Sequence, residues 1–208
     1  MLIDLTVSGF VEELASNSPA PGGGSTAALA GTLGAALSIM VCNFTVDNPK
    51  FSDVQEEISL VRKKGIELNK SLLDYIDADT NAFDQVMKAY KLPKETDAEK
   101  TLRAEKIQEA NKQATLLPMK VAQACIEVME LSIKVLTIGN PNTACDGAVS
   151  GVMTYAGFQG AILNAKINLH SIKDQAFNED IRVKTKVMQS EAERIHQLIQ
   201  AQAFKVIG

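Results

Sequence analysis

The stretch "SPAPGGGSTAALAGTLGAALSIMVCNFT", residues 18–45, constrains the fold of this chain more than any other segment. Its proline- and glycine-rich start cannot be helical, and no charged residue follows until Asp47. An apolar run this long is either a membrane span or a helix at the centre of a bundle. Ala and Gly dominate the run, Thr26, Thr32 and Ser38 are polar, and basic or aromatic flanks are missing. We therefore interpret it as a central bundle helix and predict no membrane contact.

The rest of the chain shows the period of helices. Apolar residues recur at i, i+3, i+4 and i+7 almost throughout, and no run alternates like a strand, which predicts an all-α fold. The length of 208 residues, without a repeat or a long linker, predicts a single-domain helical bundle over residues 1–208. Pro118 interrupts one helical pattern and is expected to kink or divide it. The predicted helices cover residues 4–16, 25–46, 51–90, 97–117, 118–137, 143–171 and 177–206.

Composition excludes several classes of partner. The net charge of −4 offers no basic field for a polyanion, and 5% aromatic content without Trp leaves few platforms for stacking bases. We predict no nucleic-acid partner. The N-terminal "MLIDLTVSGFVEELA" has acids where an export signal needs bases, and its apolar residues follow helical spacing. A cytoplasmic protein is expected.

The cysteines and histidines do not predict a metal centre. Cys42, Cys125 and Cys145 are widely spaced, form no CxxC pair, and are expected to be reduced thiols. His170 and His196 lie in no cluster with other ligating residues. We predict no metal.

Asp79 interrupts the apolar stripe of the helix predicted over 51–90. It lies four residues from Tyr75 and four from Phe83, so its carboxyl should point inward with them. A buried carboxyl that has no partner keeps its proton and is a natural proton donor. A structural role is equally compatible with the pattern, because Asp79 could instead cap a neighbouring helix or meet a buried Lys.

The helix after the turn "GNPN" carries polar groups along one line. Asp146 and Asn164 are eighteen residues apart, which gives five turns and the same azimuth. The face around this line also holds Ser150, Gly157, Gly160 and Asn168. A flat ligand or a second closely packed helix would fit against such a face, and Asp146 could also be a charge favoured by the helix dipole.

The glycine turn Gly22–Gly24 precedes the central helix. Glycines permit conformations that other residues avoid, and Ser25 is expected to be the N-cap. Free N–H groups at a helix start can bind an anion or polarise a carbonyl, although such a turn by itself is merely a helix start.

Five stretches taken together resemble the cyclodeaminase domain of formiminotransferase-cyclodeaminase and its stand-alone bacterial relatives, which include methenyltetrahydrofolate cyclohydrolases. The chain departs from the family pattern at Cys145, where Ser is expected before the aspartate. The resemblance implies an all-α bundle that forms homodimers. The matching stretches are "SPAPGGGSTAALAGTLGAAL", "DADTNAF", "ATLLPMKVA", "GNPNTACDGAV" and "AILNAKINL".

The resemblance also implies a reaction, the conversion of 5-formiminotetrahydrofolate to 5,10-methenyltetrahydrofolate with release of ammonia. N10 attacks the amidine carbon, and the departing nitrogen must then be protonated. Asp79 matches the family's D-x-x-A-F segment and is predicted to be the proton donor. Apart from the folate itself, no cofactor is expected. The other predicted site residues are Asp146 and Asn142, which would hold the pterin or the formimino nitrogen; Asn140, Asn164 and Asn168, which would line the slot; and Gly22, Gly23, Gly24 and Ser25, which would close it.

Two alternatives stay open at this stage. The same scaffold could hydrolyse 5,10-methenyltetrahydrofolate to 10-formyltetrahydrofolate, which also needs proton transfer at a bound folate. A non-catalytic helical oligomer serving as a scaffold is the alternative from another class. It predicts that a structural partner neutralises Asp79 and that no pocket joins Asp79 to Asp146.

Overall fold

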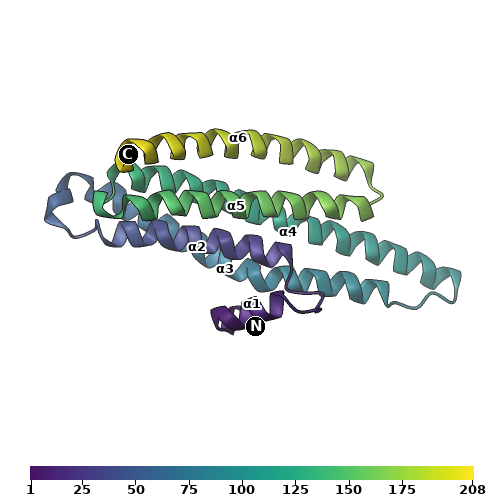
Figure 1. The fold of residues 1–208 in the computed structure, drawn as a ribbon. Helices are drawn as coiled ribbons and strands as arrows, with labels where there is room; N and C mark the ends of the chain where they lie inside the picture. The colour runs from purple at the N-terminus through teal and green to yellow at the C-terminus, as the bar shows by residue number, and fades with distance from the viewer.

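The structure is a computed structural model that describes all residues 1–208, and every regular element in it is a helix (Figure 1). The all-α bundle predicted from the sequence is confirmed. A short 3-10 turn at Leu2–Asp4 precedes the first helix, and further 3-10 turns at Pro49–Val54, Pro141–Thr143 and Leu169–Ser171 join later helices. The helices are α1 (Val7–Leu14), α2 (Gly23–Asn43), α3 (Gln55–Tyr90), α4 (Asp97–Ile138), α5 (Ala144–Asn168) and α6 (Gln175–Ile207).

Helices α2 and α5 form the centre of the bundle. They pack against each other, α3 flanks α2, α6 flanks α5, and α4 contacts all four (Figure 1). Small residues allow this close approach, since a Cβ at Gly157 would meet the Ala27 carbonyl at 2.8 Å. One hydrophobic core runs through the bundle and contains Leu72, Val128 and Phe158, all fully buried. The glycines predicted on the polar face of α5 therefore serve helix packing.

Helix α2 is long and apolar enough to cross a membrane by length and composition, but 56% of its most apolar window is buried inside the bundle. The rest is half-buried or exposed, and Leu33 on the exposed face is 47% exposed. The core thus explains only part of the apolar character of α2, because one of its apolar faces is exposed.

Helices α3 and α4 make an antiparallel hairpin that extends beyond the other long helices (Figure 1). The turn after Tyr90 leads into a capping box, in which Thr96 and Glu99 satisfy each other's backbone N–H groups. Because the hairpin extends so far, the far end of the α3 apolar stripe is not covered, and Met87 and Tyr90 are exposed.

Two boundary predictions were wrong. Helix α2 has Gly22 rather than Ser25 as its N-cap, and Ser25 lies within the first turn. Pro118 does not divide its helix, because α4 runs continuously from Asp97 to Ile138. The proline has no N–H to donate to the Ala114 carbonyl, and Asn168 Nδ2 donates to that oxygen instead at 2.9 Å.

Two other helix boundaries differ slightly from prediction. The helix predicted over 4–16 is a 3-10 turn followed by the short α1, which Thr6 caps by accepting from the Gly9 N–H. The helix predicted over 143–171 ends at Asn168 and continues as a 3-10 turn. Neither difference alters the packing of the bundle.

Candidate functional site

A cavity of about 380 Å³ opens where α2 begins, α5 ends and the α3–α4 hairpin passes both. This volume lies in the range of small-molecule sites. It contains six of the residues predicted from sequence, namely Asp79, Gly22, Gly23, Gly24, Asn164 and Asn168. The other lining residues are Pro19, Ala20, Ala82, Phe83, Val86, Tyr90, Asn111, Ala114 and Ser171.

Asp79 points inward from α3, as predicted, and contacts the start of α2. Its Oδ2 accepts from the Ser25 backbone N–H at 2.9 Å and from Ser25 Oγ at 3.2 Å. Asp79 therefore caps α2 from a neighbouring helix, which is one of the two structural roles considered. It forms no ion pair with Lys or Arg, and its Oδ1 receives no hydrogen bond within the chain. One oxygen is held and the other is available in the cavity.

Burial raises the pKa of the Asp79 carboxyl, and the two hydrogen bonds from Ser25 oppose this rise without cancelling it. The apolar surround disfavours the charged form more than the bonds favour it. A carboxyl in this state can hold and release a proton closer to neutral pH than an exposed one.

This pKa predicts a pH dependence of stability. The native state keeps the Asp79 proton at pH values where the unfolded chain, with an aspartate pKa near 3.8, has released it. Stability is then lost as pH rises through the native pKa. The free energy of unfolding of the wild type, measured relative to Asp79→Asn by urea titration, should fall as pH rises above 4 and then level off. A difference that is flat with pH, or rises, would contradict the raised pKa.

The glycine turn brings backbone close to both polar groups of the cavity. A Cβ at Gly24 would overlap the Asp79 carboxyl, and a Cβ at Gly23 would meet Asn164 Nδ2 at 3.1 Å. The N–H groups of Gly23 and Gly24 belong to the first turn of α2, where helices lack internal partners for their donors. They can donate to an anion or a carbonyl oxygen in the cavity.

Asn164 and Asn168 lie on successive turns at the end of α5. Asn164 Nδ2 donates to the Gly160 carbonyl at 2.8 Å, and Asn168 Nδ2 donates to the Ala114 carbonyl at 2.9 Å. Each amide is thereby oriented, which leaves its oxygen as the free acceptor.

Asp146, Asn140 and Asn142 do not reach this cavity within one chain. Asp146 lies in the first turn of α5, eighteen residues before Asn164, which places it about 27 Å away along the helix axis. Asn140 holds the turn instead, donating from its N–H to Thr45 Oγ1 and from Nδ2 to the Phe44 carbonyl. Within a single chain these residues therefore do not line one slot with Asn164, because residues that share an azimuth need not lie at the same level along the helix axis.

Sequence reasoning missed an apolar wall and one amide. Phe83 and Val86 continue the apolar stripe of α3 beyond the first turn of α2, and with Tyr90 they line the cavity. The sequence feature that could have indicated them is the apolar stripe of α3, which is longer than the helix α2 that packs on it. Asn111, on α4, lies 7% exposed on the opposite wall and had no signal in the sequence pattern.

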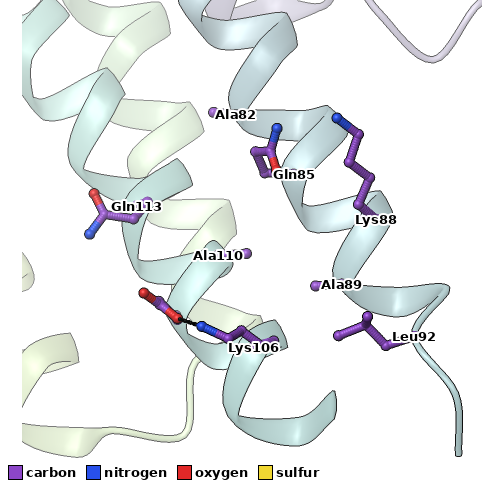
Figure 2. Close-up of a pocket in the computed structure, with 9 residues that line it drawn as sticks. Ala82, Gln85, Lys88, Ala89, Leu92, Lys106, Ala110 and Gln113 are labelled. Carbon is purple, nitrogen blue, oxygen red and sulfur yellow. Dashed lines mark hydrogen bonds and ion pairs between the residues drawn. The ribbon is translucent and has the colours of Figure 1, made fainter. Parts of the chain in front are cut away.

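A second cavity of about 400 Å³ lies between α3 and α4 and shares Ala82 with the first cavity (Figure 2). Its polar groups are at the surface, and Lys106 is already paired with Glu109 at 2.8 Å. It contains no buried acid, so we place the chemistry at Asp79.

The fold and the cavity together define an all-α protein with one shielded acid in a ligand-sized pocket beside a helix start. The chain belongs to the formiminotransferase-cyclodeaminase family, whose model matches residues 6–187. The resemblance predicted from the motifs is thus confirmed.

Three relatives show what the chain is similar to. A methenyltetrahydrofolate cyclohydrolase of Methylorubrum extorquens is 40% identical over 94% of this chain and 96% of its own length. A formimidoyltransferase-cyclodeaminase of Mus musculus is 34% identical over 86% of this chain, which spans 33% of that longer protein. The crystal structure of a formiminotetrahydrofolate cyclodeaminase from Thermotoga maritima matches with a TM-score of 0.89 and 27% identity, covering 100% of both chains.

Proposed function

We propose that this chain binds a tetrahydrofolate carrying a one-carbon unit and hydrolyses 5,10-methenyltetrahydrofolate to 10-formyltetrahydrofolate. The observation that carries the proposal is Asp79, whose carboxyl has one oxygen fixed by Ser25 and the other available in the cavity. The full-length likeness to a cyclohydrolase, at 40% identity, favours this reaction over the cyclodeamination expected from sequence.

The residues of the cavity suit the steps of this hydrolysis. Water adds to the cationic methenyl carbon and gives one proton to Asp79. The bond from that carbon to N5 then breaks while Asp79 returns its proton to N5, and the remaining proton of the added water is released to solvent as the formyl carbonyl forms. A group that accepts and returns a proton contributes about 10²–10⁴-fold to such a reaction. The N–H groups of Gly23 and Gly24 would polarise the developing carbonyl oxygen.

Cyclodeamination is the second candidate, and the likeness to the Thermotoga enzyme favours it. There, N10 attacks the formimino carbon and its proton moves to the departing nitrogen. Asp79 supplies the further proton with which that nitrogen leaves as ammonia. Both reactions pass through a tetrahedral carbon between N5 and N10, so one pocket serves either. Neither requires a metal or redox cofactor, because the folate carries the one-carbon unit, and a cytoplasmic location remains our prediction.

The scaffold alternative has some support in a single chain, since Asp79 does cap α2 and no cavity joins it to Asp146. A cap alone needs one oxygen, however, and does not need a cavity with an apolar wall. The shape of the site therefore favours ligand binding over a scaffold.

One assay separates the three hypotheses. The pure protein is incubated first with 5,10-methenyltetrahydrofolate and then with 5-formiminotetrahydrofolate, and the methenyl absorbance is followed. Loss of absorbance above the spontaneous rate identifies the cyclohydrolase, and a gain from the second substrate identifies the cyclodeaminase. A protein that changes neither rate would be the scaffold.

We also propose that the chain forms a homodimer through the outward faces of α2 and α5. These faces carry exposed apolar side chains although the helices are central in the bundle, and adjacent exposed patches of this kind mark interfaces. The side chains are Leu33, Val149, Val152, Leu163 and Ile167.

A two-fold axis through the middle of this face, perpendicular to α5, would place the start of α5 in one subunit beside the end of α5 in its partner. It would then carry Asp146 of the partner subunit toward the cavity of the first, which gives the distant polar motif a role. Asp79→Asn and Asp146→Asn proteins should each be inactive as homodimers. Refolded as an equal mixture they should regain about a quarter of wild-type activity, since half the dimers are mixed and each mixed dimer has one intact site.

Light scattering provides the control for this experiment, because the mixture must contain dimers. Dimers that regain no activity, or an Asp146→Asn protein with full activity, would contradict a shared site while leaving the assignment of Asp79 unaffected.

A further inference from the structure

Asn111 is the one buried amide of the cavity whose nitrogen is left without a partner. The residue is 7% exposed, and its Nδ2 forms no hydrogen bond in the chain. Asn164 and Asn168, in contrast, each donate to a helix carbonyl. Leaving a buried donor unpaired costs free energy, so a residue kept in this state is explained by a partner that arrives from outside.

The position of Asn111 relative to Asp79 follows from the antiparallel hairpin. The pairs Lys64–Glu127 and Tyr90–Arg103 fix the register of α3 against α4. In that register Asn111 lies level with Ala82, about one turn beyond Asp79. Two groups on opposite edges of one ligand ring could therefore contact Asp79 and Asn111 at the same time.

We propose that Asn111 binds the lactam edge of the pterin ring, donating from Nδ2 to the 4-oxo group and accepting from N3–H at Oδ1. This assignment rests on the proposed folate reaction. A primary amide and a lactam are complementary, since each offers one donor beside one acceptor. The 4-oxo group adjoins N5, where the one-carbon chemistry takes place, and the neighbouring Phe83 and Val86 provide an apolar wall for the ring.

The test uses 5-formyltetrahydrofolate as the probe and isothermal titration calorimetry as the measurement. Asn111→Leu removes both hydrogen bonds and should weaken binding by about 10–100-fold. The same substitution replaces an unpaired polar group by an apolar one, so the free energy of unfolding should stay equal or rise. A purely structural amide predicts the reverse, lower stability with unchanged affinity. Asn81→Leu, an exposed site on α3, is the matched control and should leave affinity unchanged.

Asn111→Asp tests the lactam contact itself. An ionised carboxylate repels the 4-oxo oxygen, whereas a protonated one offers the same donor and acceptor as the amide. The affinity of this variant, relative to wild type, should rise as pH falls from about 8 to about 5, while that of Asn111→Leu should not change.

The outcomes separate this proposal from the proposed function. Wild-type protein that binds the probe, with Asn111→Leu binding equally well, overturns the role of Asn111 and leaves the folate function standing. Wild-type protein that binds no 5-formyltetrahydrofolate overturns both. An Asn111→Asp affinity that follows wild type at every pH overturns the lactam contact.

Discussion

Replacing Asp79 by Asn is expected to lower kcat by about 10²–10⁴-fold in the methenyl absorbance assay, with little change in KM. The amide keeps an oxygen for the Ser25 N–H, so the cap of α2 survives and the fold should remain intact. What the variant loses is a proton that can be exchanged during the reaction.

Asp84→Asn is the matched control, because Asp84 is an exposed carboxylate on the same helix. It should retain wild-type turnover. If Asp79→Asn also turns over normally while circular dichroism shows a native helix content, Asp79 is a structural cap and the proton donor lies elsewhere.

Gly24→Ala should produce the largest combined effect on activity and stability. The added Cβ would overlap the Asp79 carboxyl, so either the carboxyl or the start of α2 must move. Overpacking of this kind costs about 1–3 kcal/mol of stability, and a displacement of about 1 Å at a reacting group lowers kcat by about 10²-fold.

Gly22→Ala is the control two residues earlier in the same turn. A Cβ at Gly22 meets nothing within 4 Å, and the residue has a negative φ of −135° that other residues adopt. We expect near-normal stability for this variant; the comparison is limited to stability, because Gly22 itself lines the cavity. Equal losses of stability in Gly22→Ala and Gly24→Ala would show that the turn requires flexibility, rather than room for the close approach to Asp79.

The inward direction of Asp79 could be predicted from sequence because it follows from helical period alone. Four-residue spacing from Tyr75 and Phe83 fixes the azimuth of the side chain whatever surrounds the helix. The glycine turn was predictable for a similar reason, since Gly22 to Gly24 mark a helix start wherever it lies in the fold. The identity of the N-cap was not predictable, because the acceptor that replaces it comes from another helix.

The position of a residue along the bundle axis, relative to the cavity, could not be predicted from the sequence pattern. Asp146 and Asn164 share an azimuth, yet the length of α5 separates them, and only tertiary packing shows that the cavity lies at the Asn164 end. Pro118 and Asn168 illustrate the same limit. The carbonyl that the proline leaves free is satisfied by a side chain fifty-four residues away from it in sequence, a contact that no local rule contains.

A crystal structure of the protein with 5-formyltetrahydrofolate would locate the site directly. We predict pterin density between the glycine turn and α3, with N5 or its formyl group within hydrogen-bond distance of Asp79 Oδ1. Folate bound away from that carboxyl, for instance in the cavity beside Lys106, would contradict the role of Asp79 on which this account depends.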